Sequence, residues 1–289
     1  GALVAAEDDD LGVPPQSWLL ETGVDAVHLF DSDIDDSDSE VSVDRVAVNS
    51  CLTYAPERRQ AFRLNLGYEH HDYHFTELAG RDNPWDGVQK LSVDVPIRLG
   101  LTEQWSLFAV PSVEFTAEEG ADWEDAATVG GMLGFVYRVN DRFRIGPAVV
   151  AGSEIEDDAT VMPGLIVDWQ INDRLRFRTG GAPQGALAPG ANLTWTWTEK
   201  TRFVLAAGRE KLRFRLDDNG VARNGVGEDM GYPLSLGVTH RLGEHASLAV
   251  MGGAKFGGEL TLEEADGDRI VEKDYDPQPF VGISLQVSF

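Results

Sequence analysis

Hydrophobic and polar residues alternate one by one along most of the chain, in runs of about ten residues separated by polar connections. The last run is the clearest, because Val281, Ile283, Leu285, Val287 and Phe289 fall on one side of an extended chain, with Gly, Ser and Gln residues between them. A period of two indicates a β-strand with one apolar face and one small, polar face. Soluble sandwiches also contain such strands, so the rest of the chain must decide the class.

About fourteen runs of this kind follow one another, and each is predicted to be a strand. Their approximate ranges are 17–29, 41–55, 60–75, 87–101, 104–117, 126–139, 142–153, 159–171, 173–181, 190–199, 201–216, 230–242, 245–258 and 278–289. Single-chain bacterial outer-membrane barrels contain an even number of antiparallel strands. The count is therefore compatible with a closed barrel.

The connections between these strands alternate in length. Short polar turns, such as 140–141, 172–173 and 199–200, have the composition and length of hairpin turns. The connections between them are longer and acidic, at 30–40, 76–86, 117–125, 154–158, 182–189, 217–229 and 259–277. Short turns at one end and long loops at the other are typical of a membrane barrel, whereas a soluble barrel has no reason to sort its loops by length.

Two features interrupt the alternation. Five prolines inside predicted strands each remove a backbone donor, so we expect local bulges at Pro96, Pro111, Pro147, Pro163 and Pro233. The apolar positions of 201–216 also change face between Ala207 and Leu212, which predicts a bulge near Arg209.

Charge and composition narrow the class. The net charge of −25 and the pI near 4.4 argue against a nucleic-acid partner, whose phosphates would be repelled. No run of about 18 apolar residues is present, so no transmembrane helix is predicted. Alternating strands escape such a search, and the single Cys51 excludes a disulfide framework.

Aromatic residues gather near the short turns and at the chain end, where an interfacial girdle would lie. The predicted girdle consists of Trp105, Tyr137, Phe143, Trp169, Trp195, Trp197 and Phe289. A second girdle at the loop side is expected to include Phe214 and Tyr232. The alternative, a soluble aromatic core, is less favoured because most of these residues share the face assigned outward.

Residues 136–143 and 168–175 repeat one unit: an amphipathic strand, a polar turn, and an aromatic or apolar residue that starts the next strand. Together with the final Phe289, this repeat resembles the uncharacterised, porin-like outer-membrane β-barrel families of Gram-negative bacteria. The resemblance covers nearly the whole chain and implies an all-β, transmembrane, antiparallel up-and-down barrel of about 14 strands, with 12 or 16 as alternatives. Residues 17–289 would form this single domain. Residues 1–16 would be a tail, either a signal remnant or an ordinary flexible start.

The same resemblance implies a location in the cell outer membrane of a Gram-negative bacterium. Outer-membrane lipid and lipopolysaccharide would then be partners, and the C-terminal strand would be recognised by the barrel-assembly machinery. It leaves the oligomeric state open.

The polar faces of the strands are rich in arginine. The predicted pore-lining residues are Arg63, Asp94, Arg98, Glu114, Arg144, Asp168, Arg174, Arg176, Arg178, Arg202, Arg213 and Arg215. One interpretation is an Arg-rich constriction that attracts anions, and an equally supported one is a set of ion pairs that brace or plug the lumen. Because about fourteen strands enclose more space than side chains alone normally fill, we favour a pore.

Two further groups of residues were considered for chemistry. Asp31, Asp33 and Asp35 supply alternating oxygens that suit calcium, and calcium could bridge them to lipopolysaccharide; a solvated acidic loop is the better-supported interpretation because the EF-hand pattern is absent. The segment His70–His74 could serve a rim hydrolase, but no nucleophile motif accompanies it, so we expect no enzyme. No other cofactor is predicted.

These observations rank three functions. The first is a passive pore for small polar or anionic solutes. The second is a closed structural or interaction barrel that presents acidic extracellular loops. The third is a hydrolase at the rim of the barrel.

Overall fold

The computed structural model describes residues 16–57, 59–76, 83–180 and 190–289, so the predicted tail lies outside the described residues apart from Gln16. The strands are β1 (Ser17–Asp33), β2 (Glu40–Glu57), β3 (Gln60–Phe75), β4 (Gly87–Asp94), β5 (Ile97–Gly100), β6 (Trp105–Glu118), β7 (Ala127–Asn140), β8 (Phe143–Glu154), β9 (Asp157–Asn172), β10 (Leu175–Thr179), β11 (Gly190–Thr196), β12 (Thr201–Gly208), β13 (Glu210–Arg215), β14 (Val226–Arg241), β15 (Ala246–Glu263), β16 (Arg269–Tyr275) and β17 (Gln278–Ser288). One short 3₁₀ helix, η1 (Trp123–Ala126), precedes β7. Among these residues no helix is long and apolar enough to cross a membrane.

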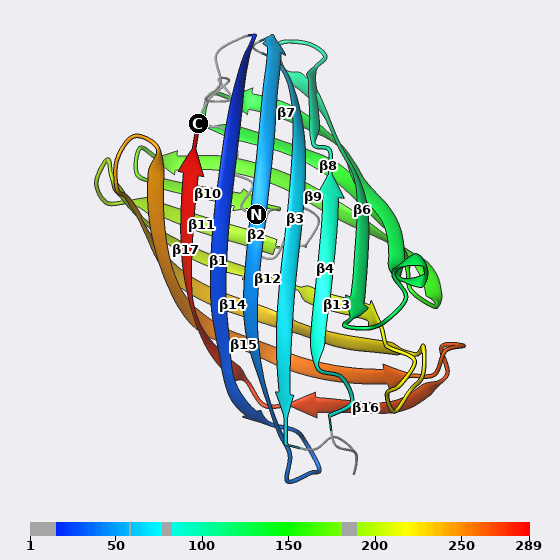
Figure 1. Cartoon of the computed structure of the whole chain (residues 1–289). Helices are drawn as coiled ribbons and strands as arrows, with labels where there is room; N and C mark the ends of the chain where they lie inside the picture. Colours follow the sequence, from blue (N-terminus) through cyan, green and yellow to red (C-terminus); the bar gives the residue numbers. More distant parts are fainter. Residues whose placement is uncertain (1–15, 58, 77–82, 181–189) are drawn as a thin grey trace.

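The strands form one closed antiparallel barrel (Figure 1). Successive strands pair with each other, and the last strand β17 pairs with β1, so that Leu285 lies opposite Val24. The seventeen segments make fourteen wall spans, because β4 and β5, and likewise β12 and β13, are halves of one span, and β16 lies in the connection between β15 and β17. The predicted fold class and the predicted count of fourteen are confirmed.

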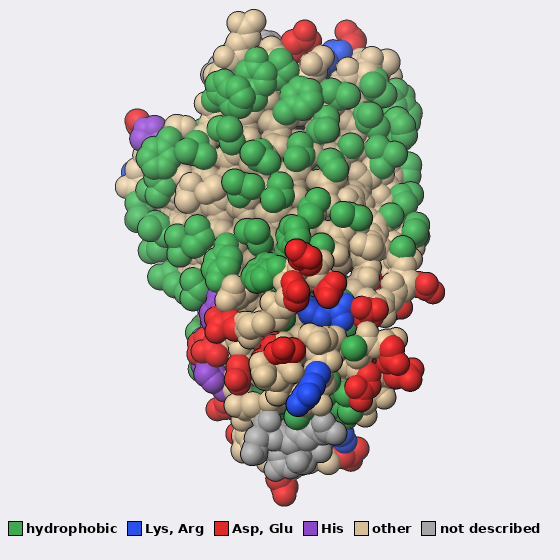
Figure 2. Space-filling view, turned by 45° about the vertical axis from the view of Figure 1, so that its right-hand side comes forward, with side chains coloured by type: hydrophobic (Ala, Val, Ile, Leu, Met, Phe, Trp, Pro, Cys, Tyr) green, Lys and Arg blue, Asp and Glu red, His purple; other side chains and the backbone are tan. Residues whose placement is uncertain are grey.

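The outer surface of the barrel carries a broad apolar belt. Alternate residues of the spans are exposed and hydrophobic, among them Leu66, Val161 and Leu236, and Val161 is 67% exposed. On the face drawn in Figure 2, apolar side chains cover the upper part of the molecule and charged side chains cover the lower part. Within the belt the described strands are paired on both sides, so this part of the wall can lie in hydrocarbon without unsatisfied backbone groups.

On the loop side of this belt, apolar residues lie on the inner face of the wall and polar residues lie on the outer face. On β2, Val46 and Val48 are exposed on the outer face, whereas Val41 and Val43, nearer to the loops, are buried inside. The charged residue Asp44 is exposed at the change. Beyond the belt the barrel is therefore built like a water-soluble protein, with apolar side chains inside and charges outside.

A ring of nine strand segments forms this loop-side part: β1, β2, β3, β4, β6, β13, β14, β15 and β16. Two bridges close it: β13 pairs in parallel with β6 at Arg215 and Ala117, and β16 meets β1 at Tyr275 and Ile34. Side chains can fill a barrel of about eight strands. This ring is filled by Leu29, Ile34, Val41, Val43, Tyr73, Trp85, Val88, Leu212, Phe214, Leu216, Ala222, Leu260, Leu262, Tyr275 and Phe280, which we call the cap core.

The structure corrects several local predictions. The β14–β15 register shifts between Met230 and Tyr232, next to Pro233. At Pro96, β4 and β5 keep one register against β3 and against β6, and Arg63 N donates to the Pro96 carbonyl oxygen over 2.9 Å, so the bulge predicted at Pro96 is wrong. Pairing continues in register through Pro111, Pro147 and Pro163, so the bulges predicted there are wrong. Each of these prolines removes one donor from a long ladder, and the remaining pairs hold the register.

The bulge predicted near Arg209 is also wrong. The span β12–β13 keeps one offset against β14, with Ala207 opposite Leu234 and Lys211 opposite Met230. The apolar residues change face because this span passes from the membrane belt into the cap. Phe214, predicted for the outer girdle, is consequently buried in the cap core. Strand β16 was not predicted, because its residues lie in a segment interpreted as a loop.

Candidate channel lumen

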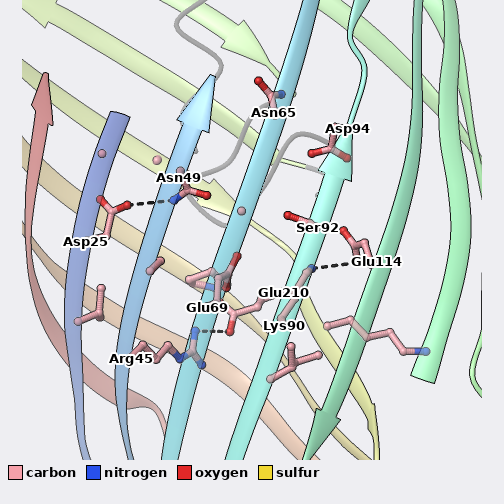
Figure 3. A pocket seen from close by; sticks show the side chains of 18 of the residues that line it. Asp25, Arg45, Asn49, Asn65, Glu69, Lys90, Ser92, Asp94, Glu114 and Glu210 are labelled. Atoms are coloured by element: carbon pink, nitrogen blue, oxygen red, sulfur yellow. Dashed lines mark hydrogen bonds and ion pairs between the residues drawn. The ribbon is translucent and has the colours of Figure 1, made fainter. Parts of the chain in front are cut away.

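The barrel encloses a cavity of about 660 Å³. Its lining begins near the short turns, at Glu21, Arg202 and Gln286, and reaches Glu154 and Lys211 on the loop side. Figure 3 shows polar side chains of β1–β4 and of the strands facing them gathered around this space. These side chains occupy the inward positions of strands whose outward positions form the apolar belt.

Charges of both signs line the cavity. Among the described residues the cations are Arg45, Arg63, Lys90, Arg178, Arg202, Arg209, Lys211, Arg213 and Lys255, and the acids are Glu21, Asp25, Glu69, Asp94, Glu114, Glu154 and Glu210. Nine cations against seven acids leave a small positive excess. The lumen is thus mixed in charge, in contrast to the acidic chain as a whole.

Neighbouring strands neutralise many of these charges. Lys90 of β4 lies 3.0 Å from the Glu114 carboxylate of β6, and Asn49 of β2 donates to Asp25 of β1 over 3.3 Å (Figure 3). Arg202, by contrast, makes no ion pair with a described residue, and the same is true of Arg63. The two free guanidinium groups stand on β12 and β3, on different parts of the wall.

A buried network closes the loop end of the cavity. The Asp229 carboxylate of β14 accepts hydrogen bonds from Lys255 Nζ at 2.6 Å, from the Tyr275 hydroxyl at 2.8 Å and from the Tyr73 hydroxyl at 3.0 Å. Beside it, Arg45 donates to Glu210 over 2.5 Å. Lys255 is only 1% exposed, and these groups come from six strands.

Burial also keeps the tyrosines of this network protonated. Burial, followed by the nearby Asp229 carboxylate, raises the pKa of Tyr275 well above its ordinary value. Tyr275 therefore remains a neutral donor at physiological pH. The cap core lies directly on the loop side of these residues, so polar and apolar side chains together fill the axis of the barrel there.

The predicted pore-lining residues separate into two sets. Those that line the cavity are Arg63, Asp94, Glu114, Arg178, Arg202 and Arg213, and those that do not are Arg98, Arg144, Asp168, Arg174, Arg176 and Arg215. Arg176 is held by two 2.7 Å hydrogen bonds to Asp168, which lies opposite Arg144 in the next strand.

The other departures follow from position in the wall. Arg174 is exposed on a short turn, and Arg98 lies in β5 beside another short turn. Arg215 is on the outer face of β13, where Glu156 binds it at 2.6 Å. The sequence interpretation assumed an inward position for every polar residue of a strand, and this fails beyond the belt.

Sequence reasoning missed Arg45, Asp229 and Lys255. The sequence contains a signal for two of them, because alternate residues of a strand share a face. Arg45 therefore lies on the same face as Ala47 and Asn49 of β2, and Lys255 lies on the same face as Gly253 of β15, which was predicted to face inward. Their convergence required knowing which distant strands meet across the barrel.

The predicted girdle residues lie on or near the outer face. The rings of Trp105 and Tyr137 are tilted against each other with centroids 4.9 Å apart, and the rings of Phe143 and Trp169 have centroids 5.9 Å apart. Trp195 and Trp197 both contact Phe203. Phe289 is 73% exposed, and its backbone exchanges two hydrogen bonds with Leu20 where the barrel closes.

The carboxylates proposed for calcium do not come together. Asp31, Asp33 and Asp35 are exposed, and within the described part of the chain no three His, Cys, Asp or Glu side chains are grouped to hold a metal ion. The alternate residues Ser32 and Ile34 are buried.

The histidine segment is divided between the two faces of the wall. His71 is buried inside and lies 3.1 Å from Glu69. His70 lies 3.8 Å from Glu119, and His74 lies 3.7 Å from Asp72 on the outer face. His70, Asp72 and His74 thus share the outer face, as predicted for a strand, whereas His71 is separated from them by the wall.

Comparison with solved structures gives the same architecture. The COG4313 outer membrane channel from Pseudomonas putida F1 superimposes with a TM-score of 0.52 at 10% identity, covering 96% of this chain and 97% of that one. A Pseudomonas aeruginosa FadL homologue superimposes with a TM-score of 0.51 at 10% identity, covering 93% and 89%. At this identity the likeness concerns the fold, which is that of outer-membrane barrels.

The sequence matches none of the curated proteins. A family described as a domain of unknown function (DUF6268) matches residues 74–288, which is well over half of the chain and spans the wall from the end of β3 to β17. The chain therefore belongs to the DUF6268 family, and its structure is a fourteen-stranded β-barrel with the fold of outer-membrane channels.

Proposed function

We propose that the protein is a channel of the Gram-negative outer membrane through which small polar or anionic solutes diffuse passively. The observation that carries this proposal is the polar cavity of about 660 Å³ inside a barrel with an apolar outer belt. The likeness in fold to outer-membrane channels supports the same conclusion.

The charges that line the lumen give the channel an expected preference for anions. Two of the lumenal cations, Arg63 and Arg202, have no ion-pair partner among the described residues, and lumenal charges set the selectivity of pores. An anion in the lumen would meet these guanidinium groups directly. The acids Asp25 and Asp94 limit the preference, so neutral polar solutes and some cations would also pass.

Single-channel recording of the refolded protein in a planar bilayer tests this proposal. We expect stable conductance steps, with a reversal potential in a salt gradient that indicates modest anion preference. In the double variant Arg63→Gln/Arg202→Gln the anion-to-cation permeability ratio should fall about twofold or more, because the free lumenal cations are gone. Arg142→Gln is the matched control, since Arg142 lies on a short turn and pairs with Asp173.

A second candidate is a closed barrel whose acidic loops are its working surface. The filled cap core and the buried network around Asp229 favour it, since both obstruct the barrel axis. Absence of conductance from barrels whose folding is verified would select this candidate. Conductance that is unchanged by the double arginine variant would keep the channel and discard the arginine mechanism.

We expect no enzymatic activity. His70, Asp72 and His74 share the outer face of β3, but no nucleophile motif accompanies them, and His71 lies on the inner face. Binding of lipopolysaccharide at the loop-side rim and recognition of β17 by the barrel-assembly machinery remain part of this proposal. Both follow from the outer-membrane location.

A further inference from the structure

The hydrogen-bonded wall has a gap on its loop side. Up to Gly208, β12 pairs with β11, and Gly208 lies opposite Gly190. Beyond that point β13 pairs with β14 along its whole length, but its other edge has no strand partner in the described chain until Arg215 meets Ala117 of β6. In the part of the chain that the structure describes, the edge from Glu210 to Phe214 is therefore an interruption in the wall.

The turn between β8 and β9 covers this gap, and side chains alone hold it. Lys211 Nζ lies 2.5 Å from the Glu154 carboxylate, and Arg213 Nε donates to the Ile155 carbonyl oxygen over 2.7 Å. Arg215 follows with a 2.6 Å contact to Glu156. Three cations from one face of β13 thus bind three successive residues of the turn, and we call this set of contacts the clasp.

The clasp separates the cavity from the outside. Glu154, Ile155, Lys211 and Arg213 all line the cavity, yet the Lys211 and Glu154 side chains are still 25% and 17% exposed. Alternating apolar and charged residues place Lys211 and Arg213 on the charged side of the wall, outside the membrane belt. A path through this gap would therefore lead from the lumen to the aqueous loop side and would not enter lipid.

The barrel axis offers no comparable path. On the axis the Asp229 carboxylate is buried and accepts three hydrogen bonds, and the cap core behind it is apolar. At the gap, by contrast, the closing contacts are side-chain contacts, and the Lys211–Glu154 ion pair among them is partly exposed; exposed ion pairs are weak beside a strand ladder. The β8–β9 register also shifts between Gly152 and Glu154, so the ladder is irregular at the tip.

We propose that the loop-side mouth of the channel is this gap beside β13, and that Lys211, Arg213 and Glu154 at its rim determine which solutes pass. This inference rests on the proposed function. Besides Glu154, the rim cations pair with Glu228 and Glu263: Lys211 lies 3.2 Å from Glu228, and Arg213 lies 3.0 Å from Glu228 and 2.5 Å from Glu263. Because the rim cations are compensated by these acids, the rim would admit small polar solutes and would exclude bulky solutes by size. Displacement of the β8–β9 turn, without any change in the barrel wall, would widen the mouth.

A reversible cross-link tests the location of the mouth. In a Cys51→Ala background, Glu154→Cys/Lys211→Cys would be bridged by a short bis-methanethiosulfonate reagent, with bridging verified by mass. We expect single-channel current to fall about tenfold and to return with reductant, because the solute path is tied shut. Arg142→Cys/Asp173→Cys, which replaces an exposed ion pair at the short-turn side, is the matched control and should keep its current.

A second variant opens the clasp. Glu154→Lys places like charges at the rim, and we expect the open probability to rise at least about twofold. A current that is unchanged by a verified Glu154–Lys211 bridge would place the mouth elsewhere and overturn this inference, while leaving the channel itself intact. Silence of both the folded wild type and Glu154→Lys would overturn the inference together with the proposed function. A silent wild type with a conducting Glu154→Lys would support both.

Discussion

At the scale of single residues, Asp229 shows how a charge is kept inside a membrane barrel. Its carboxylate is neutralised by Lys255 and receives hydrogen bonds from two tyrosines. Glycines provide the space: a Cβ at Gly231 would lie 2.5 Å from the Lys255 side chain, and one at Gly258 would lie 2.1 Å from the Tyr275 ring. The network is thus built from charge compensation and from small residues beneath large ones.

Removal of this carboxylate should destabilise the barrel strongly. Asp229→Ala leaves a buried ammonium group and two tyrosine hydroxyls without their acceptor, which we expect to cost about 3–5 kcal/mol of unfolding free energy. The midpoint of urea unfolding, followed by tryptophan fluorescence of the refolded protein in detergent micelles, measures the effect.

Asp173→Ala is the control for that substitution. Asp173 also binds an arginine, Arg142 at 2.7 Å, but both side chains are exposed, so the change should stay within about 0.5 kcal/mol. Equal losses for Asp173→Ala and Asp229→Ala would show that the buried network adds nothing beyond a surface ion pair.

At the scale of single elements, β8 illustrates how strand spacing depends on one glycine. A Cβ at Gly146 would lie 1.6 Å from the backbone oxygen of Phe135 on β7, so only glycine permits this approach. The same strand carries Gly152, where a Cβ would have no neighbour closer than 3.7 Å. Two glycines that look alike in the sequence therefore have different roles.

The matched substitutions Gly146→Ala and Gly152→Ala should separate these roles. We expect Gly146→Ala to lower the unfolding free energy by about 1–3 kcal/mol, because β7 and β8 must move apart. Gly152→Ala should raise the unfolding free energy by less than about 1 kcal/mol, because alanine reduces the conformational freedom of the unfolded chain. Refolding yield and urea midpoints, measured side by side, give the comparison. An unfolding free energy that is unchanged in Gly146→Ala would mean that β7 and β8 can move apart without loss of stability.

At the scale of the whole molecule, the barrel consists of a membrane part and a cap with opposite chemistry. Trp195, near the short turns, is 43% exposed on the outer belt, whereas Trp85 is 1% exposed within the cap core. The same type of side chain therefore meets lipid in one part and other protein side chains in the second.

Brominated acyl chains should distinguish these two environments by fluorescence quenching. In vesicles of brominated lipid, Trp195→Phe should decrease the quenched fraction of the tryptophan emission, because it removes a lipid-facing fluorophore. Trp85→Phe should increase the quenched fraction, because the fluorophore it removes is shielded. A Trp85→Phe variant with a reduced quenched fraction would place the cap core in contact with lipid.

Much of this architecture follows from the sequence alone. Period-two alternation defined the spans, since a strand in lipid must present an apolar side chain at every second position along the belt. Alternating loop lengths defined the two ends. The count of fourteen and the closure of β17 on β1 therefore needed no knowledge of distant contacts, because each depends on local pattern and on chain order.

Only the tertiary structure decided what happens beyond the belt. The change of apolar face between Ala207 and Leu212 has two possible structural causes. Either the strand contains a bulge, or the core moves from the outer, lipid-facing side of the wall to its inner side, and the local sequence pattern is the same for both. Which one holds depends on whether β6 and β13 meet, and these segments lie about a hundred residues apart in the chain. The cap, the buried Asp229 network and the gap beside β13 all arise from that long-range meeting, which no local alternation encodes.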